Sequence, residues 1–349
     1  MEPIVVASSR GPYRVVVRED AADDLGAVVD EFNREGTRFA VVSRRVLELH
    51  RERIERALPG ATVLPVDDGE GVKSFAAVEA LLDSLIASGA RRDSTVIAVG
   101  GGSVGDAAGF AASILYRGVD LVHVPTTLLA QVDSSVGGKV AVNHRRGKNL
   151  VGSFWPPRAV VSDIAFLKTL PEEELRSGTF EALKAGVIGD EALFELTRAP
   201  FHVASGEIVR RAIAVKAAIV SEDEREGDRR RLLNYGHTIG HAIEAALGYG
   251  RLTHGDAIAW GMIGANALGA KRGLLDPAER ARIDDAVRNL APKPPREIGP
   301  EAVLKAAGLD KKFTDRARVM ILARRVGECA IVEVSDEELR YAVEAALAP

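Results

Sequence analysis

The chain has 349 residues, of which 46% are hydrophobic and 28% are charged, and its formal net charge is −4. This length allows two domains, and the composition is ordinary for a globular protein. A slightly acidic chain offers no basic surface for nucleic acid, no apolar run is long enough to cross a bilayer, and the first residues lack the pattern of a secretory signal. The single cysteine, Cys329, excludes an intrachain disulfide. We therefore expect a cytoplasmic protein that binds neither membranes nor nucleic acid.

The first half of the chain alternates short strand-like runs with helical stretches. Strands are expected over 13–17, 38–42, 61–66, 95–99 and 121–124, and helices over 21–35, 46–58, 74–88 and 106–115. This alternation indicates βαβ units and a parallel sheet. Residues 96–99 are all apolar and 121–124 are apolar except for His123, without the alternation of a half-exposed strand, as expected for strands that are covered on both faces. The sequence therefore predicts an α/β domain over residues 1–163.

Beyond about residue 167 the pattern becomes mainly helical. Helices are expected over 171–188, 205–222, 237–247, 256–271, 276–290 and 300–307, followed by a hairpin over 319–334 and a helix that begins at Asp336. These elements predict a second, mostly helical domain over residues 164–349.

A glycine-rich loop joins one expected strand to the next expected helix. Gly100, Gly102 and Gly105 have the Gly-x-Gly-x-x-Gly spacing. Without side chains the backbone can approach a pyrophosphate, and the free N–H groups of the helix start face the anion. The acidic residue that usually follows about twenty positions later is missing, because His123 to Pro125 lie there. The loop therefore predicts a Rossmann-like variant of a nucleotide site, or a site for another phosphate.

Three histidines lie close together in the second half: His237, His241 and His254. On a helix, the first two share one face with Glu244. Two histidines and a carboxylate, with a fourth position open to substrate, form a common catalytic zinc set. The alternative is a pair of hydrogen-bonded histidines on a partly buried helix. The third histidine, expected in a loop before a glycine, favours a metal.

Small polar residues fill the segment that follows the glycine loop. Residues 125–139 include Asp133 and Lys139, and Lys148 and Asn149 come shortly after. An exposed loop can have this composition. Lysine and amide groups beside a nucleotide loop also suit a small polyhydroxylated phosphate, since lysine binds phosphate as a point charge and the amide binds hydroxyls.

Several of these blocks together resemble the 3-dehydroquinate synthase family of sugar-phosphate cyclases. The matching blocks run in order along most of the chain: 100–106, 125–139, 147–149, 167–171, 181–184, 232–241 and 310–312. The resemblance implies a dehydroquinate synthase-like fold, with an NAD-binding domain and a helical metal- and substrate-binding domain. It also implies a lyase of the shikimate pathway of aromatic amino acid biosynthesis. Such an enzyme converts 3-deoxy-D-arabino-heptulosonate 7-phosphate to 3-dehydroquinate and phosphate by oxidation, phosphate elimination, reduction and aldol closure, using NAD and zinc, or cobalt in its place.

Carried over position by position, the resemblance implies a set of site residues. The metal ligands would be Glu181, His237 and His254. The substrate's carboxylate, hydroxyls and phosphate would meet Asp133, Lys139, Asn149, Lys184, Lys216, Arg230, Asn234, His241, Lys311 and Lys312, with Glu226 as an orienting carboxylate. NAD would lie on Gly100, Gly101, Gly102, Ser103, Val104, Gly105 and Asp106, flanked by Glu70, Lys73, Thr126, Thr127, Lys139 and Lys148. Arg117 would reach the phosphate site of a neighbouring subunit, which implies a homodimer.

The sequence also departs from the family pattern and leaves alternatives open. Arg44 stands where an acidic residue or asparagine often meets the ribose, so the choice between NAD and NADP stays open. Phe180 precedes Glu181 where a smaller residue is usual. It also stays open which arginine of 229–231 and which lysine of 311–312 contacts substrate.

Three other functions compete with this interpretation. A sister cyclase would act on a different sugar phosphate. A metal-dependent polyol dehydrogenase would release its reduced cofactor and would need no cluster of phosphate-binding cations. A non-catalytic metabolite-binding relative would lack a metal ligand or Lys139, and this chain lacks neither.

Overall fold

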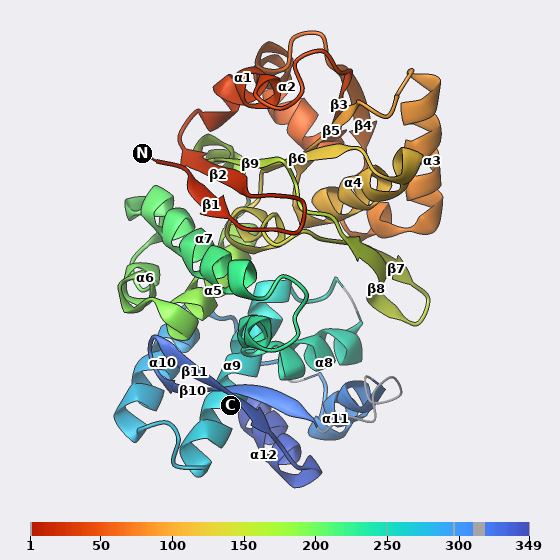
Figure 1. Ribbon diagram of the computed structural model, residues 1–349. Helices are drawn as coiled ribbons and strands as arrows, with labels where there is room; N and C mark the ends of the chain where they lie inside the picture. Colours follow the sequence, from red (N-terminus) through yellow and green to blue (C-terminus); the bar gives the residue numbers. More distant parts are fainter. Residues whose placement is uncertain (1, 249, 296, 310–317, 349) are drawn as a thin grey trace. The chain divides into compact units, whose positions relative to one another are not determined.

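The chain folds into two compact units in the computed structural model, which describes residues 2–248, 250–295, 297–309 and 318–348 (Figure 1). The first unit comprises Met1–Leu170 and Ser205–Arg225, and the second comprises Pro171–Ala204 and Glu226–Pro349. The division therefore falls after Leu170 rather than at our expected boundary near Asp163. Helix α7 (Ser205–Glu222), which we expected in the helical domain, belongs to the first unit because it packs against β1, β2 and the turn that holds Asp133.

A seven-stranded sheet forms the core of the first unit, in the order β1-β2-β9-β6-β5-β3-β4. Its strands are β1 (Ile4–Val6), β2 (Tyr13–Arg18), β3 (Arg38–Ser43), β4 (Thr62–Val66), β5 (Thr95–Gly100), β6 (Asp120–Pro125) and β9 (Ala159–Asp163). All neighbours pair in parallel except β1 and β2, which pair antiparallel at one edge. The predicted parallel sheet is confirmed, although the sequence pattern missed β1 and β9.

Helices cover both faces of this sheet. They are α1 (Leu25–Asp30), α2 (Arg44–Ala57), α3 (Phe75–Ala87) and α4 (Gly102–Ile114). Val41 and Ala98 pack in a cluster with α3 and α4, whereas their chain neighbours Val42 and Val99 pack in a second cluster with α1 and α2. Because successive strand residues point to opposite faces, these strands must be apolar at every position.

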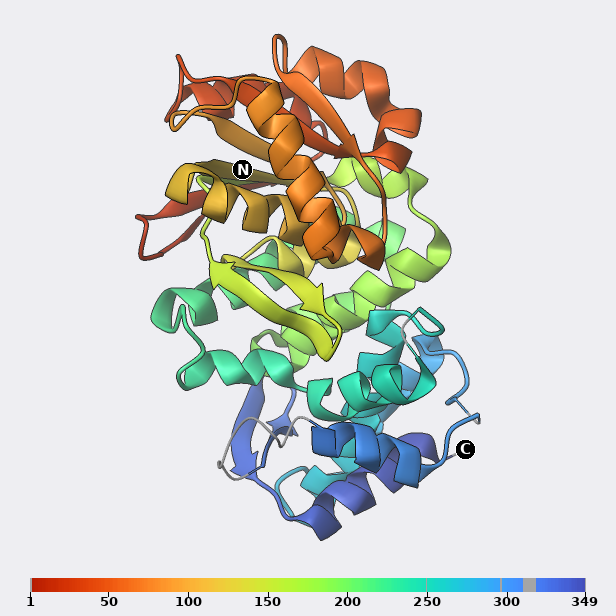
Figure 2. The same ribbon diagram turned by 90° about the vertical axis from the view of Figure 1, so that its right-hand side faces the viewer.

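A second, two-stranded sheet lies at and beyond the end of the segment that is rich in small polar residues. It consists of β7 (Lys139–His144) and β8 (Gly147–Phe154), which pair antiparallel and appear as the yellow-green hairpin in Figure 2. The hairpin packs on α4 at Gly109, where an added Cβ would come within 2.4 Å of Val140. The chain therefore forms a hairpin over residues 139–154, where the sequence pattern predicted no strands.

The second unit is built around one buried helix, α9 (His254–Lys271), all of whose residues from 255 to 269 are buried. Five elements pack around α9: α5 (Glu172–Gly189), α8 (His237–Leu247), α10 (Pro277–Leu290), α12 (Asp336–Leu347) and the strand β10 (Val319–Arg325). The unit also contains α6 (Glu191–Thr197), α11 (Pro300–Leu309) and β11 (Glu328–Glu333). At Gly261 an added Cβ would lie 1.9 Å from the carbonyl oxygen of Gly236, so α8 and α9 cross in direct backbone contact. Among the residues that the structure describes, no helix has the length and apolarity to cross a bilayer.

The buried histidine of β6 predicts that acid destabilises the first unit. His123 is 5% exposed, and burial lowers its pKa from 6.5 to about 4. As the pH falls between these values, the unfolded chain takes up a proton that the folded unit excludes, so stability decreases across this window. The loss amounts to about 3 kcal/mol.

We expect His123→Gln, which stays neutral, to show a shallower decline of the urea unfolding midpoint between pH 6.5 and pH 4 than the wild type. Parallel declines for the two proteins would show that His123 does not carry this penalty.

Candidate active site

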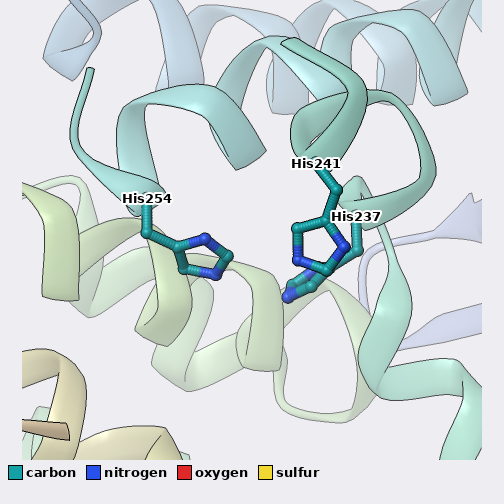
Figure 3. A group of neighbouring side chains, drawn as sticks. All are labelled: His237, His241 and His254. Atoms are coloured by element: carbon teal, nitrogen blue, oxygen red, sulfur yellow. The ribbon is translucent and has the colours of Figure 1, made fainter. Parts of the chain in front are cut away.

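Three imidazoles meet in the second unit (Figure 3). His237 and His241 lie on the first turns of α8, and His254 is the first residue of α9. Their ligand nitrogens all lie within 4.8 Å of one another. We expected His254 in a loop, but it is the first residue of a helix. The spacing of four residues puts the α8 pair on one face, and the start of α9 brings the third ring to it.

A buried carboxylate from a distant part of the chain lies beside two of these rings. Glu181 on α5 is 2% exposed, and its Oε1 is 3.7 Å from Nε2 of His237 and 3.4 Å from Nε2 of His254. The ammonium of Lys184, one turn along α5, is 2.5 Å from Oε2. Within the described part of the chain, neither oxygen receives a hydrogen bond of ordinary geometry. Burial alone would raise the pKa of Glu181, but Lys184 and the two histidines hold that pKa well below its usual range.

This donor set fits a divalent metal ion. A carboxylate oxygen and two imidazole Nε2 atoms converge on one point, and zinc binds both kinds of donor. The opposite nitrogen of each ring meets an acceptor: Nδ1 of His237 is 3.2 Å from the carbonyl oxygen of Tyr235, and Nδ1 of His254 is 3.0 Å from Oε2 of Glu244. Because both partners can only accept, each Nδ1 carries a hydrogen, which leaves each Nε2 as the nitrogen for a metal ion.

The pKa values of the two histidines move in opposite directions. For His237, burial and then the charge of Lys184 lower the pKa well below its usual range. For His254, burial would also lower the pKa, but the two flanking carboxylates, Glu181 and Glu244, together outweigh burial and raise it to about 9. The His254 ring is thus the more basic of the two, because it lies between two carboxylates.

A close contact between α9 and α5 places His254. The N–H group of Gly255 donates to Oγ of Ser177 at 3.0 Å, and a Cβ on Gly255 would lie 2.1 Å from the carbonyl oxygen of Ser177. Next to this contact, the guanidinium of Arg176 donates to both carboxylate oxygens of Asp256 at 2.9 Å. The start of α9 therefore contacts α5 at Ser177, one turn before Glu181. This contact places His254 beside the Glu181 carboxylate.

Other predicted substrate contacts also lie in the second unit. Arg230 is buried at 2% exposure whereas Arg229 is exposed, so within the arginine run Arg230 is the side chain directed inward. Nδ2 of Asn234 donates to Oε1 of Glu226 at 2.7 Å, and Glu226 has a φ of 61°. Lys311 and Lys312 lie outside the described residues.

The glycine loop of the first unit forms one wall of a pocket. The first turn of α4 consists of Gly102, Ser103, Val104 and Gly105. Gly101 is the N-cap of this helix and has no side chain that could accept from the N–H groups of the turn. The pocket is lined by this loop together with His123, Ser134 and Ser135. Ser135 is 4% exposed, and its hydroxyl has no hydrogen-bond partner among the described residues. Bare N–H groups and an unpaired buried hydroxyl fit a bound polar, anionic group.

Beside the loop lies a cluster of charged and amide groups. Nζ of Lys73, which is 4% exposed, donates to Oδ2 of Asp106 at 2.6 Å and to Oδ1 of Asn149. Glu70 accepts a hydrogen bond from Ser103 at 3.0 Å and lies 3.9 Å from Nζ of Lys148. Burial raises the pKa of Asp106 despite the nearby ammonium. The structure thus brings together six residues that the resemblance implied from three separate segments.

Further predicted residues of the first unit lie in other settings. Nζ of Lys216 on α7, 7% exposed, donates to Oδ1 of Asp133 at 2.6 Å and to its carbonyl oxygen at 2.7 Å. Thr127 caps the next turn by accepting from the N–H group of Ala130, and Thr126 is buried. Lys139 is exposed at the start of β7. Arg117, also exposed, follows Tyr116, and both have positive φ, at 71° and 50°.

Sequence reasoning missed two residues that contact the predicted set, and a third, Glu244, was noted on the histidine face but was left out of the final set. Asn143 donates to Glu70 at 2.9 Å and accepts from the N–H group of Asn149, Ser135 lines the glycine-loop pocket, and Glu244 meets His254. For Glu244 a signal existed, since it shares a helix face with the histidines. For Asn143 the hairpin itself had to be recognised first.

Comparisons with known proteins agree with this geometry. Residues 63–177 match the family model described as 3-dehydroquinate synthase N-terminal, and residues 178–313 match 3-dehydroquinate synthase C-terminal. The 3-dehydroquinate synthase of Pseudomonas entomophila (strain L48) is 42% identical over 325 residues, which cover 89% of this chain and 88% of that protein.

Two solved structures resemble the whole chain. The 2-epi-5-epi-valiolone synthase of Streptomyces hygroscopicus subsp. jinggangensis 5008, with NAD+ and Zn2+ bound, has a TM-score of 0.85 at 30% identity and 96% coverage of both chains. A 2-deoxy-scyllo-inosose synthase complexed with carbaglucose-6-phosphate, NAD+ and Co2+ has a TM-score of 0.83 at 27% identity, with 98% of this chain and 99% of that chain covered.

Gly255→Ala is expected to disturb the helix contact that positions His254. The added methyl group would meet the backbone of Ser177, which cannot swing aside as a side chain can. We expect a destabilisation of roughly 1–3 kcal/mol and weaker zinc binding, measured by thermal unfolding and by competition with a chelator. Gly299→Ala is the control, because a Cβ there would contact nothing within 4 Å. Unchanged zinc affinity in Gly255→Ala would contradict the role of this contact.

Glu181→Gln tests the choice of ligands. Loss of the charged oxygen is expected to weaken zinc binding by more than the roughly 10–100-fold that follows loss of an outer-shell contact. Zinc content after dialysis is the measurement, and Glu338→Gln, which alters a half-buried carboxylate paired with Arg272, is the control. If Glu181→Gln kept its zinc while His241→Ala lost it, the ligand set would be the three histidines instead.

Proposed function

The chain belongs to the 3-dehydroquinate synthase family, and on that premise we propose that it converts 3-deoxy-D-arabino-heptulosonate 7-phosphate to 3-dehydroquinate and phosphate. The observation that carries the proposal is the cluster of Glu181, His237 and His254 with the ammonium of Lys184. These residues come from three separate segments, and they are the ones that the resemblance implied. The proposed reaction is a carbon–oxygen lyase step of the shikimate pathway.

The proposed cofactors are NAD and a divalent metal ion. Two similar structures hold NAD+ together with Zn2+ or Co2+, and the donor set of the second unit and the bare glycine loop of the first unit fit such groups. NAD is favoured over NADP by two acidic residues that follow β4 and contact the end of β3 and the start of α2. Arg44 is paired with Asp67 at 2.8 Å, and Ser43 donates to Asp68, so these carboxylates would repel a 2′-phosphate.

When bound, NAD takes up and returns a hydride while the metal ion polarises the oxygen at the reacting carbon. The chemical purpose of the oxidation is to acidify the neighbouring C–H bond, so that phosphate can leave by β-elimination. The chain's own groups bind and orient the substrate. Lys184 places a buried positive charge beside Glu181, and the buried guanidinium of Arg230 offers a planar fork for a carboxylate or phosphate.

Two residue pairs hold substrate-binding groups in place. Asp133 fixes the ammonium of Lys216 through two hydrogen bonds, so this lysine is oriented before substrate arrives. Glu226 accepts from Asn234, which orients the amide and leaves its oxygen as an acceptor for a substrate hydroxyl. Preorganised groups of this kind lower the cost of ordering on binding.

We further propose a cytoplasmic homodimer in which Arg117 contributes to the neighbouring subunit. The backbone supports a special role for this residue, because two successive non-glycine residues with positive φ cost energy and such strain gathers at functional sites. A sister cyclase is the second candidate function, since the two similar structures act as valiolone and inosose synthases. The curated relatives favour the first candidate, with 42% identity over most of both chains.

The decisive assay supplies the purified protein with zinc, NAD and the heptulosonate phosphate. We expect one phosphate released per substrate without net accumulation of NADH, because the hydride is returned within each turnover. NADH formed in proportion to product would identify a polyol dehydrogenase. Release of phosphate only from another sugar phosphate would identify a sister cyclase.

A further inference from the structure

We propose that Glu244 is a positioning residue that holds His254 in the tautomer and orientation for metal binding. This inference rests on the proposed metal site, and it concerns a residue that does not belong to the ligand set. Glu244 lies on α8, two turns beyond His237, and is 6% exposed.

The contacts of the His254 ring define the role of Glu244. Oε2 of Glu244 is 3.0 Å from Nδ1, while Oε1 of Glu181 is 3.4 Å from Nε2. The imidazole therefore lies between two carboxylates, one at each nitrogen. A carboxylate can only accept, so Glu244 holds a hydrogen on Nδ1 and directs Nε2, the nitrogen that would bind a metal ion, toward Glu181.

Glu244 is placed to support a ligand rather than to be one. Its Oε2 contacts the ring nitrogen opposite the one that faces Glu181. A carboxylate behind a metal-bound imidazole fixes its orientation and makes it a stronger donor.

The two ligand histidines need different support. The side chain of His237 is 12% exposed and its Nδ1 meets the neutral carbonyl of Tyr235, which lies two residues before it in the chain. The side chain of His254 is 31% exposed, and the residue is the first of α9. A more exposed ring at a helix start loses more side-chain conformational entropy when it is fixed in one rotamer. A charge-assisted hydrogen bond from a carboxylate on another helix is strong enough to offset that loss. Helix α8 thus supplies one ligand and the support for the other.

The test compares metal binding by Glu244→Ala and Glu244→Gln with that of the wild type. Alanine removes the acceptor, whereas glutamine keeps an oxygen that accepts from Nδ1 but carries no charge. We expect zinc affinity, measured by chelator competition, to fall about 10–100-fold in Glu244→Ala and less in Glu244→Gln. Asp284→Asn is the matched control, because it alters another buried carboxylate of the second unit whose partners are Asn266 and Arg280.

A spectroscopic signal separates positioning from general destabilisation. In the cobalt-loaded protein, each metal-bound histidine with a hydrogen on Nδ1 gives a shifted, exchangeable proton resonance. We expect one of these resonances to exchange faster with water in Glu244→Ala than in the wild type and in Asp284→Asn, while the other is unchanged.

Wild-type zinc affinity and unchanged resonances in both Glu244 variants would overturn the inference and leave the metal site intact. Failure of the wild type itself to bind zinc would instead overturn the proposed metal site, and the role of Glu244 with it. If Glu244→Ala did not fold, Glu244→Gln would decide, since a variant of the same shape with wild-type affinity and exchange contradicts the positioning role.

Discussion

The buried negative charge of Glu181 is the constraint on which the second unit depends. At 2% exposure, this carboxylate can remain ionised only if positive charge or hydrogen-bond donors surround it. Lys184 lies one turn along the same helix, while the two imidazoles come from α8 and α9. The packing of three helices is therefore tied to one charge. Removing one partner of such a group typically costs about 3–5 kcal/mol, because the remaining charge stays buried.

The same constraint explains why the helices approach so closely. The charge can be matched only if α9 begins directly against α5, and the contact between Gly255 and Ser177 permits this. The ion pair of Arg176 with Asp256 holds the junction from the side. Structural packing and the proposed chemistry thus share residues, so stability and metal affinity are coupled in this unit.

The first unit differs, since its glycine loop presents backbone groups rather than side chains. The N–H groups at the start of α4 can meet a ligand only if no capping side chain accepts from them, and Gly101 has no side chain. The flanking cluster of Lys73, Asp106 and Asn149 is already paired internally. A ligand that enters would therefore exchange partners within a formed network rather than meet isolated charges.

Much of this arrangement could be predicted from the sequence, and the remainder depends on contacts between distant segments. Alternating apolar runs predicted the parallel sheet, because buried strands and amphipathic helices leave strong local patterns. Strand β9 was missed because its place between β2 and β6 is set by pairing with remote residues. The histidine spacing indicated a metal site directly. Glu181 entered only through resemblance, and the role of Glu244 depends on how α9 returns to α8.

The most direct test is a crystal structure of the zinc-loaded protein with anomalous diffraction measured at the zinc edge. The account predicts one strong peak about 2.0–2.2 Å from a Glu181 oxygen and from Nε2 of both His237 and His254. A peak bound by His241 in place of Glu181, or a peak elsewhere in the molecule, would contradict the account.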